Sequence, residues 1–273
     1  MLSDEKQNDI ITNLRANKYQ PDFFIKCLTS MLYEREERPE RPLFVSWDLV
    51  NYCNLNCFFC SANALRRIDS NSPDIKNYEK ILKRLVEIKP LYVSLLGGEP
   101  TLHPYWLEIV STLNKAGIFV ELISNGVCID EGSAKILSEL NQHLLRVKIS
   151  LDSYIPEHND KQRGKNSFSL AINALENFNT YPIKNLRVQM VITPFNVNDI
   201  FHTYKFLHNY NVSSFGATNI LPTGRANHFK KSLDEDLVIE EFSKCLVYYN
   251  EMKKIRIEKI GIGYEKQRQF IES

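Results

Sequence analysis

The chain has 273 residues, and 43% of them are hydrophobic, which is enough for one large core. It carries 34 Lys and Arg against 33 Asp and Glu, so its net charge of +1 gives no electrostatic reason to expect nucleic acid or an acidic membrane as a partner. No apolar run approaches the roughly 18 residues of a membrane span, and the polar start of the chain does not resemble a signal peptide. Six cysteines are too few for a disulfide scaffold, which favours a reducing cytoplasm.

The sequence divides into three expected parts: a short helical arm (residues 1–42), a main domain (43–230), and a C-terminal helix and tail (231–273). In the main domain, short apolar runs rich in β-branched and aromatic residues alternate with amphipathic stretches. The expected strands are residues 44–49, 91–96, 118–123, 145–151, 186–192 and 214–220. The expected helices are residues 77–89, 105–116, 131–140, 167–179, 198–210 and 234–254.

This alternation predicts an α/β fold with a parallel sheet and right-handed crossovers. The apolar strands indicate burial on both faces of that sheet. A doubly wound open sheet and a partial (β/α)6 TIM-like barrel both fit. Each predicted strand ends in a chemically distinctive loop, and in a barrel all six loops meet at the carboxyl-end face, where active sites lie. The loops therefore favour the partial barrel.

Three cysteines lie within eight residues, directly after the first predicted strand. Cys53, Cys57 and Cys60 form a C-x₃-C-x₂-C loop, and soft thiolates suit iron–sulfur clusters or zinc. A closed zinc site needs four ligands, often as two pairs, and the sequence has no second C-x₂-C or H-x₃₋₅-H pair. Three cysteines on a four-iron cluster leave one iron open to an exogenous molecule. Buried structural thiols, or zinc completed by a distant His, are the alternatives.

The cysteine loop and a second element resemble the radical S-adenosylmethionine (SAM) superfamily, over about residues 43–225. The matching residues are the three cysteines, the aromatic Phe59, and the run Gly97, Gly98, Glu99 and Pro100 after the second predicted strand. The resemblance implies a [4Fe–4S] cluster whose open iron binds SAM. It also implies reductive cleavage of SAM to a 5′-deoxyadenosyl radical that abstracts hydrogen from a substrate, in an oxygen-sensitive enzyme. The family's Gly-Gly-Glu-Pro element holds the methionine amino group, because glycines let carbonyls approach the ammonium and the Glu99 carboxylate complements it.

Softer matches extend the implied SAM site to the ends of the third and fourth strands. Ser124 and Asn125 lie where the family often places a Ser-Asn pair near the cofactor. Ser150 aligns with a ribose contact, and Asp152 either joins it or faces the substrate. Arg163 is implied to meet the methionine carboxylate with its guanidinium fork, the alternative being a solvated surface charge.

The remaining cysteines lie apart from one another. Cys27 and Cys245 fall in apolar helical stretches, which is typical of buried inert thiols. Cys128 follows the third strand, near the implied cofactor, and is a candidate hydrogen-atom donor, the alternative being a loop thiol that points away. Residues 221–226 resemble a P-x-G-R-A segment of peptide- and cofactor-maturing members, or form a tight turn before a helix.

The pattern resembles family members that modify peptides or build cofactors. Their barrel usually precedes a cysteine-rich (SPASM-type) extension, and this chain ends at Ser273, about where that extension would begin. A peptide and a small molecule therefore both stay open as substrate, with flavodoxin or ferredoxin as the expected reductant. The competing functions are a non-catalytic Fe–S electron carrier or redox sensor and a zinc-stabilised binding module. The Gly-Gly-Glu-Pro element argues against a carrier, which needs no amino-acid pocket.

Overall fold

The computed structural model describes residues 42–66, 73–228 and 233–257. The expected N-terminal arm, except for Pro42, lies outside the described residues, as do Cys27 and the tail from residue 258. The strands are β1 (Phe44–Val50), β2 (Tyr92–Gly97), β3 (Phe119–Ser124), β4 (Leu145–Ser150), β5 (Leu186–Ile192), β6 (Ser214–Asn219) and β7 (Arg256–Ile257). The α-helices are α3 (Pro73–Ile88), α4 (Trp106–Lys115), α5 (Glu131–Glu139), α6 (Pro156–Arg163), α7 (Ser167–Thr180), α8 (Ile200–Phe206) and α9 (Glu235–Met252).

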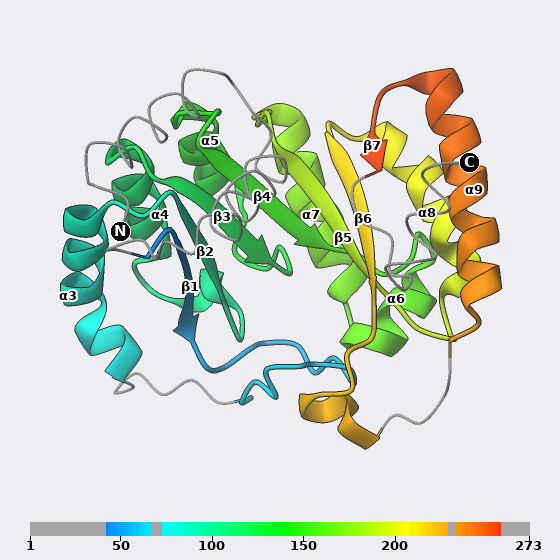
Figure 1. The fold of residues 1–273 in the computed structure, drawn as a ribbon, viewed down its shortest axis with the longest axis horizontal. Coiled ribbons are helices and arrows are strands. Elements are labelled where there is room, and N and C mark those ends of the chain that lie inside the picture. The colour runs from blue at the N-terminus through cyan, green and yellow to red at the C-terminus, as the bar shows by residue number, and fades with distance from the viewer. Residues whose placement is uncertain (1–41, 67–72, 229–232, 258–273) are drawn as a thin grey trace, which may run out of the picture.

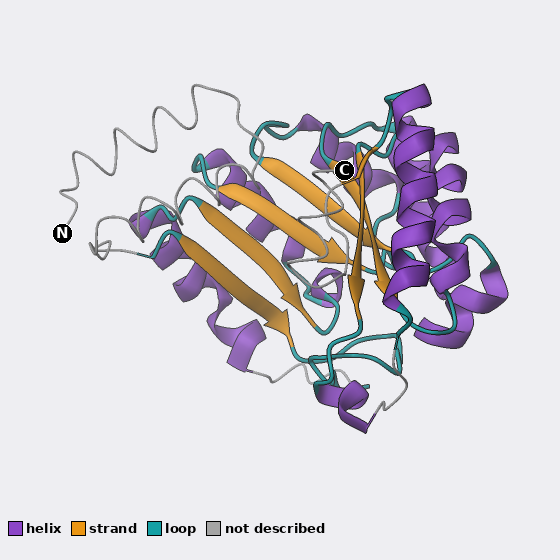
Figure 2. Ribbon diagram, turned by 45° about the vertical axis from the view of Figure 1, so that its right-hand side comes forward, coloured by secondary structure: helices purple, strands orange, loops and turns teal. Residues whose placement is uncertain are grey.

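The strands form one parallel sheet in which spatial order follows chain order from β1 to β7. The sheet curls but does not close, and the helices lie along its outer side (Figures 1 and 2). This confirms the partial TIM-like barrel predicted from the sequence. The six expected strands are all present, and β7 adds a two-residue strand beside β6 that is too short to recognise from hydrophobicity. None of the helices in the described part of the chain has the length and hydrophobicity needed to cross a bilayer.

Side chains along the strands alternate between two chemically different faces. The outer face packs against the helices and is apolar, with Val120, Leu122 and Val147 fully buried. The inner face differs from the apolar surface that the sequence suggested, because it carries buried charged groups. There the Glu121 carboxylate lies 2.8 Å from Lys148 Nζ and 3.5 Å from Arg146 Nη1. The inner face is buried around Glu121, where opposite charges rather than apolar contacts fill part of the barrel interior. It is exposed along β1 at Phe44, Ser46 and Asp48, so the expected burial on both faces holds only for part of the sheet.

Helix α6 is not among the helices expected from the sequence. Pro156 occupies its first turn with Glu157, and Lys161 and Arg163 occupy its last turn, as the helix dipole favours. Gly164, with a φ of 118°, ends the helix. This short helix carries Arg163 to the carboxyl-end face of the sheet, and it also sets the position of the cysteine loop.

Candidate active site

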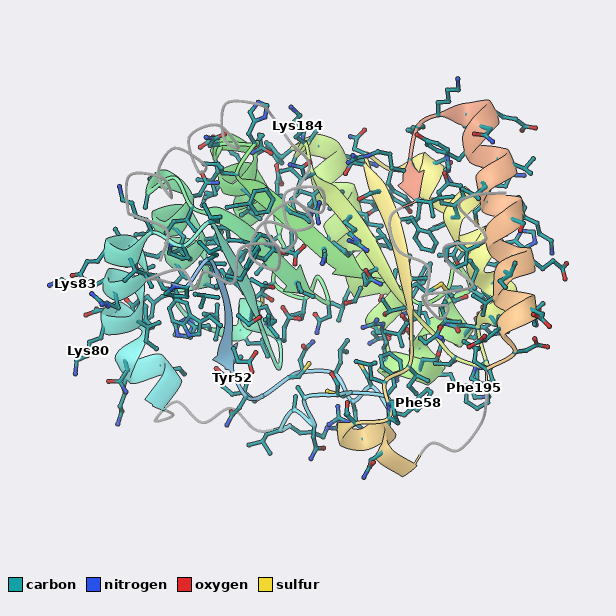
Figure 3. All side chains as sticks on the ribbon, in the orientation of Figure 1. Tyr52, Phe58, Lys80, Lys83, Lys184 and Phe195 are labelled. Carbon is teal, nitrogen blue, oxygen red and sulfur yellow. The ribbon has the colours of Figure 1, made fainter. Side chains whose placement is uncertain are left out.

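The two ends of the cysteine loop, near Cys53 and Leu65, are joined by backbone hydrogen bonds beside the end of β1. Cys53 N donates to Leu65 O at 2.8 Å, and Leu65 N donates to Asn51 O at 2.9 Å. The loop then runs across the carboxyl ends of the strands toward β6 (Figure 1). There the Phe58 ring packs edge-on against Phe195, at 6.0 Å between centroids (Figure 3). The joined ends and this contact hold the loop over the open end of the barrel.

A cavity of about 340 Å³ lies under this loop, a volume in the range of small-molecule sites. The sequence-predicted residues that line it are Cys53, Cys57, Phe59, Cys60, Gly97, Gly98, Glu99, Ser124, Asn125, Ser150 and Arg163. Pro100, Asp152 and Cys128 do not line it. Further lining residues come from β5, β6 and the segment beyond, namely Gln189, Val191, Thr218, Asn219, Leu221 and Arg225. The sequence marked the loop after β6 only as a turn or a family-like segment, and it gave no signal for the β5 positions except their place near a strand end.

The three thiols share one wall of the cavity but differ in their surroundings. Burial raises the pKa of Cys53 to about 11, against a hydrogen bond that its sulfur accepts from Leu55 N. Burial also raises the pKa of Cys57, while the nearby Arg163 charge opposes the change. Metal binding must therefore displace protons from these thiols. Among the described residues, no three Cys, His, Asp or Glu side chains gather closely enough to hold a single metal ion. The three thiols therefore share a wall but are not gathered around one point.

Gly97, the last residue of β2, and Gly98, which follows it, are required because the chain passes close to the end of β1 and the residues after it. Gly98 N donates to Val50 O at 2.7 Å, and Glu99 N donates to Tyr52 O at 2.9 Å. A Cβ atom on Gly97 would lie 2.3 Å from Val50 O, and one on Gly98 would lie 2.0 Å from Tyr52 O. Only glycine fits at either position, so the backbone of the predicted amino-group site sits directly beside the root of the cysteine loop.

Glu99 is buried at the cavity wall and ties β2 to β3. Its Oε1 accepts from Thr101 Oγ1 at 2.6 Å and Ser124 Oγ at 2.7 Å, and its Oε2 accepts from Asn125 N at 2.7 Å. Burial raises the pKa of Glu99, and these hydrogen bonds oppose the change because they favour the carboxylate. The carboxylate is therefore held rigidly, in a place where a bound ammonium would lower its pKa.

Asn125 connects the end of β3 to the cysteine loop. Its Nδ2 donates to Asn54 Oδ1 at 2.8 Å and lies 3.7 Å from Cys53 Sγ. Its Oδ1 accepts from Val127 N at 3.0 Å, which fixes the orientation of the amide. The side chain of Asn125 thus contacts the loop that carries the thiols, while the backbone N of Asn125 donates to Glu99.

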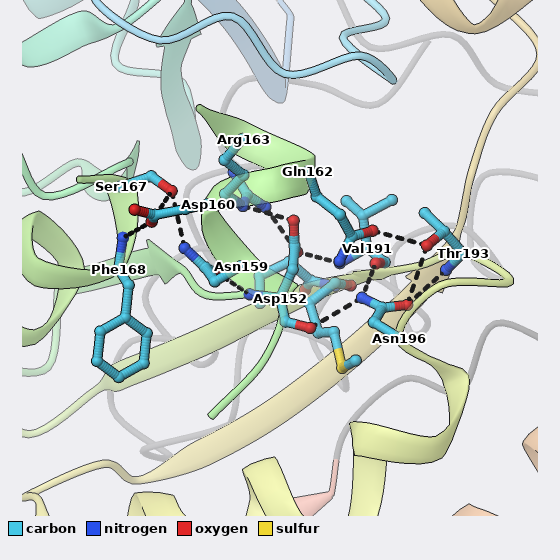
Figure 4. Close-up of polar contacts among 12 residues, drawn as sticks. Asp152, Asn159, Asp160, Gln162, Arg163, Ser167, Phe168, Val191, Thr193 and Asn196 are labelled. Carbon is cyan, nitrogen blue, oxygen red and sulfur yellow. Dashed lines mark hydrogen bonds and ion pairs between the residues drawn. The ribbon is translucent and has the colours of Figure 1, made fainter. Parts of the chain in front are cut away.

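Arg163 is buried and paired, which the sequence did not indicate. Its Nε lies 2.6 Å from Asp152 Oδ2, and its Nη2 donates to Asp152 Oδ1 at 2.8 Å. Its guanidinium lies over the Phe59 ring at 5.3 Å. Asp152 Oδ1 also accepts from Val191 N at 2.8 Å, and Asn196 Nδ2 donates to Asp152 O at 2.8 Å (Figure 4). Arg163 therefore reaches the cavity wall as one member of an ion pair, while Asp152 sits behind it.

Cys128, the candidate hydrogen-atom donor in the loop after β3, does not line the cavity. Burial raises the pKa of its thiol, and a hydrogen bond with the Thr101 side chain opposes the change. Thr101 in turn donates to Glu99, so Cys128 lies behind the Glu99 turn. Cys245, by contrast, lies on α9 and is buried in the core, where the sequence indicated an inert thiol.

The arrangement of three loop thiols and a glycine-glycine-glutamate turn can be compared with known families. The model of the radical SAM superfamily matches residues 47–207, more than half of the chain. The chain belongs to the radical SAM superfamily. Members of this superfamily use a [4Fe–4S] cluster and SAM. The match begins within β1 and includes the cysteine loop, the Glu99 turn, Asn125 and Arg163.

Among the radical SAM relatives are enzymes that mature peptides and enzymes that build cofactors. The mycofactocin maturase MftC of Mycolicibacterium smegmatis is 31% identical over 196 residues, which is 71% of this chain and 49% of MftC. The Fe-coproporphyrin III synthase of Methanosarcina barkeri is 29% identical over 205 residues, which is 75% of this chain and 49% of the synthase. The chain thus spans about half the length of these relatives.

Solved structures show the same radical SAM fold. SuiB of Streptococcus suis bound to S-adenosylmethionine superposes with a TM-score of 0.70 at 21% identity, covering 94% of this chain and 61% of SuiB. SuiB bound to its precursor peptide SuiA gives a TM-score of 0.67 at 20% identity, covering 88% of this chain and 54% of SuiB. At this level of identity the likeness concerns the fold alone.

The donor set of the cavity fits the superfamily's cofactors. Three thiols on one loop are the soft ligands that an iron–sulfur cluster takes. The Glu99 carboxylate and the Arg163 guanidinium line the same cavity, and SAM carries both an ammonium and a carboxylate in its methionine part. Glu99 thus offers the ammonium a partner of opposite charge, and Arg163 places a guanidinium, already paired with Asp152, in the same cavity wall.

Proposed function

We propose that the chain is a radical SAM enzyme that cleaves SAM reductively in this cavity and modifies a peptide. The observation that carries the proposal is that the three thiols and the Glu99 turn line one cavity at the carboxyl ends of the strands. Two relatives support the peptide as substrate: one named a mycofactocin maturase, and SuiB, whose structure with a precursor peptide shares the fold.

In this proposal each part of the cavity wall has a separate task. Cys53, Cys57 and Cys60 hold the [4Fe–4S] cluster, which when bound and reduced supplies the electron for cleaving SAM. Glu99 and the glycine carbonyls beside it receive the methionine ammonium, and Arg163 receives the methionine carboxylate. Further wall positions support the cofactor, namely Phe59, Ser124, Asn125 and Ser150. Pro100 and Asp152 act from behind the wall, Pro100 beside Glu99 and Asp152 through its ion pair with Arg163.

The decisive experiment is anaerobic reconstitution with iron and sulfide, reduction with dithionite, and addition of SAM. Formation of 5′-deoxyadenosine supports the proposal. A brown protein that forms none would instead be an electron carrier or redox sensor. A colourless, zinc-loaded protein after anaerobic purification would favour a zinc-stabilised module. Cys57→Ala, treated identically, is the control for cleavage by loosely bound iron.

The substrate requires its own test. A short peptide encoded beside the gene should change mass when it is incubated with the reduced enzyme and SAM, with flavodoxin or ferredoxin in place of dithionite as reductant. The relative named Fe-coproporphyrin III synthase makes a small-molecule substrate the second candidate. Acceleration of SAM cleavage by a tetrapyrrole but not by the peptide would favour it. We place the reaction in the reducing cytoplasm, since thiols that ligate iron must stay reduced.

A further inference from the structure

The segment beyond β6 reaches back to the cysteine loop through one arginine. Arg225 Nε donates to Cys57 O at 2.8 Å, and Arg225 Nη1 donates to Ala64 O at 2.9 Å. The backbone N of Arg225 also donates to Cys60 O at 3.0 Å. One residue thus holds three carbonyls of the loop that carries the thiols, although more than 160 positions separate them in the sequence. The segment lies directly under the loop in Figure 1.

The residue before Arg225 must be glycine for this contact to form. Gly224 has a φ of 58°. A Cβ atom on it would lie 2.3 Å from Cys60 O and 2.4 Å from Ser61 O. No side chain fits between the two backbones. Gly224 and Arg225 therefore pack closely against the backbone of Cys60 and Ser61.

The two halves of the loop are held by different elements. The first half is tied to α6, since Asn56 N donates to Arg163 O at 3.1 Å and Phe58 N donates to Gln162 O at 3.2 Å. Among the described residues, the hydrogen bonds that tie the backbone of residues 59–64 to a separate element come from Arg225. In this half of the loop, the backbone N of Arg225 holds Cys60 O and its side chain holds Ala64 O.

The charge of Arg225 is directed at the same site. Its guanidinium lines the cavity and is only partly buried. Within the described parts of the chain it has no carboxylate partner, and its side-chain hydrogen bonds go to the two carbonyls. A planar guanidinium spans two acceptors in fixed directions, which the single ammonium of a lysine does not do.

We infer that Arg225 is a positioning residue for the iron–sulfur cluster, acting by holding the carbonyls of Cys57, Cys60 and Ala64. The inference rests on the proposed function, because it takes these cysteines as cluster ligands. It adds that the geometry of the cluster loop is set by the segment that follows β6, the strand whose end also lines the cavity with Thr218 and Asn219. The fork of the guanidinium, and not its charge alone, holds Cys57 O and Ala64 O, and the backbone N holds Cys60 O.

The first test measures hydrogen exchange in the full chain without cluster. Arg225→Met and Arg225→Lys should speed exchange in residues 57–65 on the order of tenfold, because each lost hydrogen bond contributes about 1 kcal/mol. Arg66→Met is the matched control, since Arg66 is an exposed arginine of the same loop, and it should leave exchange unchanged. Unchanged exchange in Arg225→Met, or rates that rise throughout the sheet, would overturn the inference.

The second test uses the reconstituted protein. In Arg225→Met and Arg225→Lys, a chelator should remove iron about tenfold faster, and the paramagnetic resonance spectrum of the reduced cluster should change shape. Gly224→Ala should reproduce both effects with the arginine retained. Gly132→Ala should reproduce neither, because its Cβ would meet only Asp130 Oδ1, at 3.8 Å. A wild-type spectrum in Arg225→Lys would show that charge alone suffices and would overturn the role of the fork.

The proposed function and this inference fail in different ways. If Cys57→Ala keeps a full cluster, the assignment of the ligands is wrong. If Cys57→Ala loses the cluster while Arg225→Met matches the wild type in spectrum and chelation rate, only the inference about Arg225 is wrong. Hydrogen exchange in the apo-protein tests the contact independently of either result.

Discussion

Arg163 and Asp152 form an ion pair in which both partners are buried, with Nε 2.6 Å from Oδ2 and Nη2 2.8 Å from Oδ1. Asp152 belongs to the segment after β4 and Arg163 to the last turn of α6, so the pair fastens this helix to the sheet. Because α6 also supports the cysteine loop through Arg163 O, the pair links the stability of the fold to the shape of the site.

Asp152→Asn should destabilise the protein by about 3–5 kcal/mol, since it leaves the Arg163 charge buried without a counter-charge. Equilibrium denaturation of the apo-protein measures the effect. Glu87→Gln is the control, because the Arg84–Glu87 pair is exposed and contributes little. A loss in Asp152→Asn no larger than that of the control would show that Arg163 does not need its partner.

Replacing any one of Cys53, Cys57 and Cys60 by Ala should abolish the cluster, because two thiolates do not hold it against water and chelators. Iron analysis after anaerobic reconstitution should find about four irons per wild-type chain. Cys128→Ala and Cys245→Ala serve as controls and should keep that content. About eight irons in the wild type, or full brown colour in a loop variant, would contradict the single three-cysteine site.

Glu99→Gln should weaken SAM binding about ten- to a hundredfold while cluster content stays unchanged. The substitution keeps the shape of the side chain but removes the charge that would face the methionine ammonium. Calorimetric titration of the reconstituted protein with SAM is the measurement, and Glu139→Gln, an exposed change on α5, is the control. If Glu99→Gln binds SAM with the same dissociation constant as the wild type, the Glu99 turn has only a structural role.

Stability should fall in acid through Glu121. Burial by itself would raise the pKa of this carboxyl, but the charge and hydrogen bond of Lys148 and the charge of Arg146 outweigh it and hold the pKa below its ordinary 4.5. A lowered pKa contributes stability that is present above the ordinary value and is lost as the pH falls through the folded value. At pH 7 the free energy of unfolding of Glu121→Gln should therefore be lower than that of the wild type. The difference between the two should become smaller below about pH 4.5. Denaturation curves from pH 3 to 7 test this, and a constant difference would contradict it.

The strands and the thiol site could be predicted from the sequence because their signals are local. Hydrophobic runs mark the ends of β1 to β6 to within one residue, and strand order in a parallel β/α unit follows from the handedness of its crossovers. Cys53, Cys57 and Cys60 reveal a site by spacing alone, since a short loop brings them to one wall. Gly97 and Gly98 mark a close backbone approach, although the structure shows that β1 makes it.

Other features were decided only by tertiary structure, because they depend on which distant groups the fold brings together. Nothing near Arg163 in the sequence indicates that its partner is Asp152, or that a helix will carry it there. The polar interior beside Glu121 arises where charges on neighbouring strands meet. Arg225 reaches the carbonyls of Cys57 and Ala64 only because the barrel curls until β6 lies beside the loop after β1. Backbone carbonyls are the same at every position in the sequence, so only the folded chain determines which of them an arginine will bind.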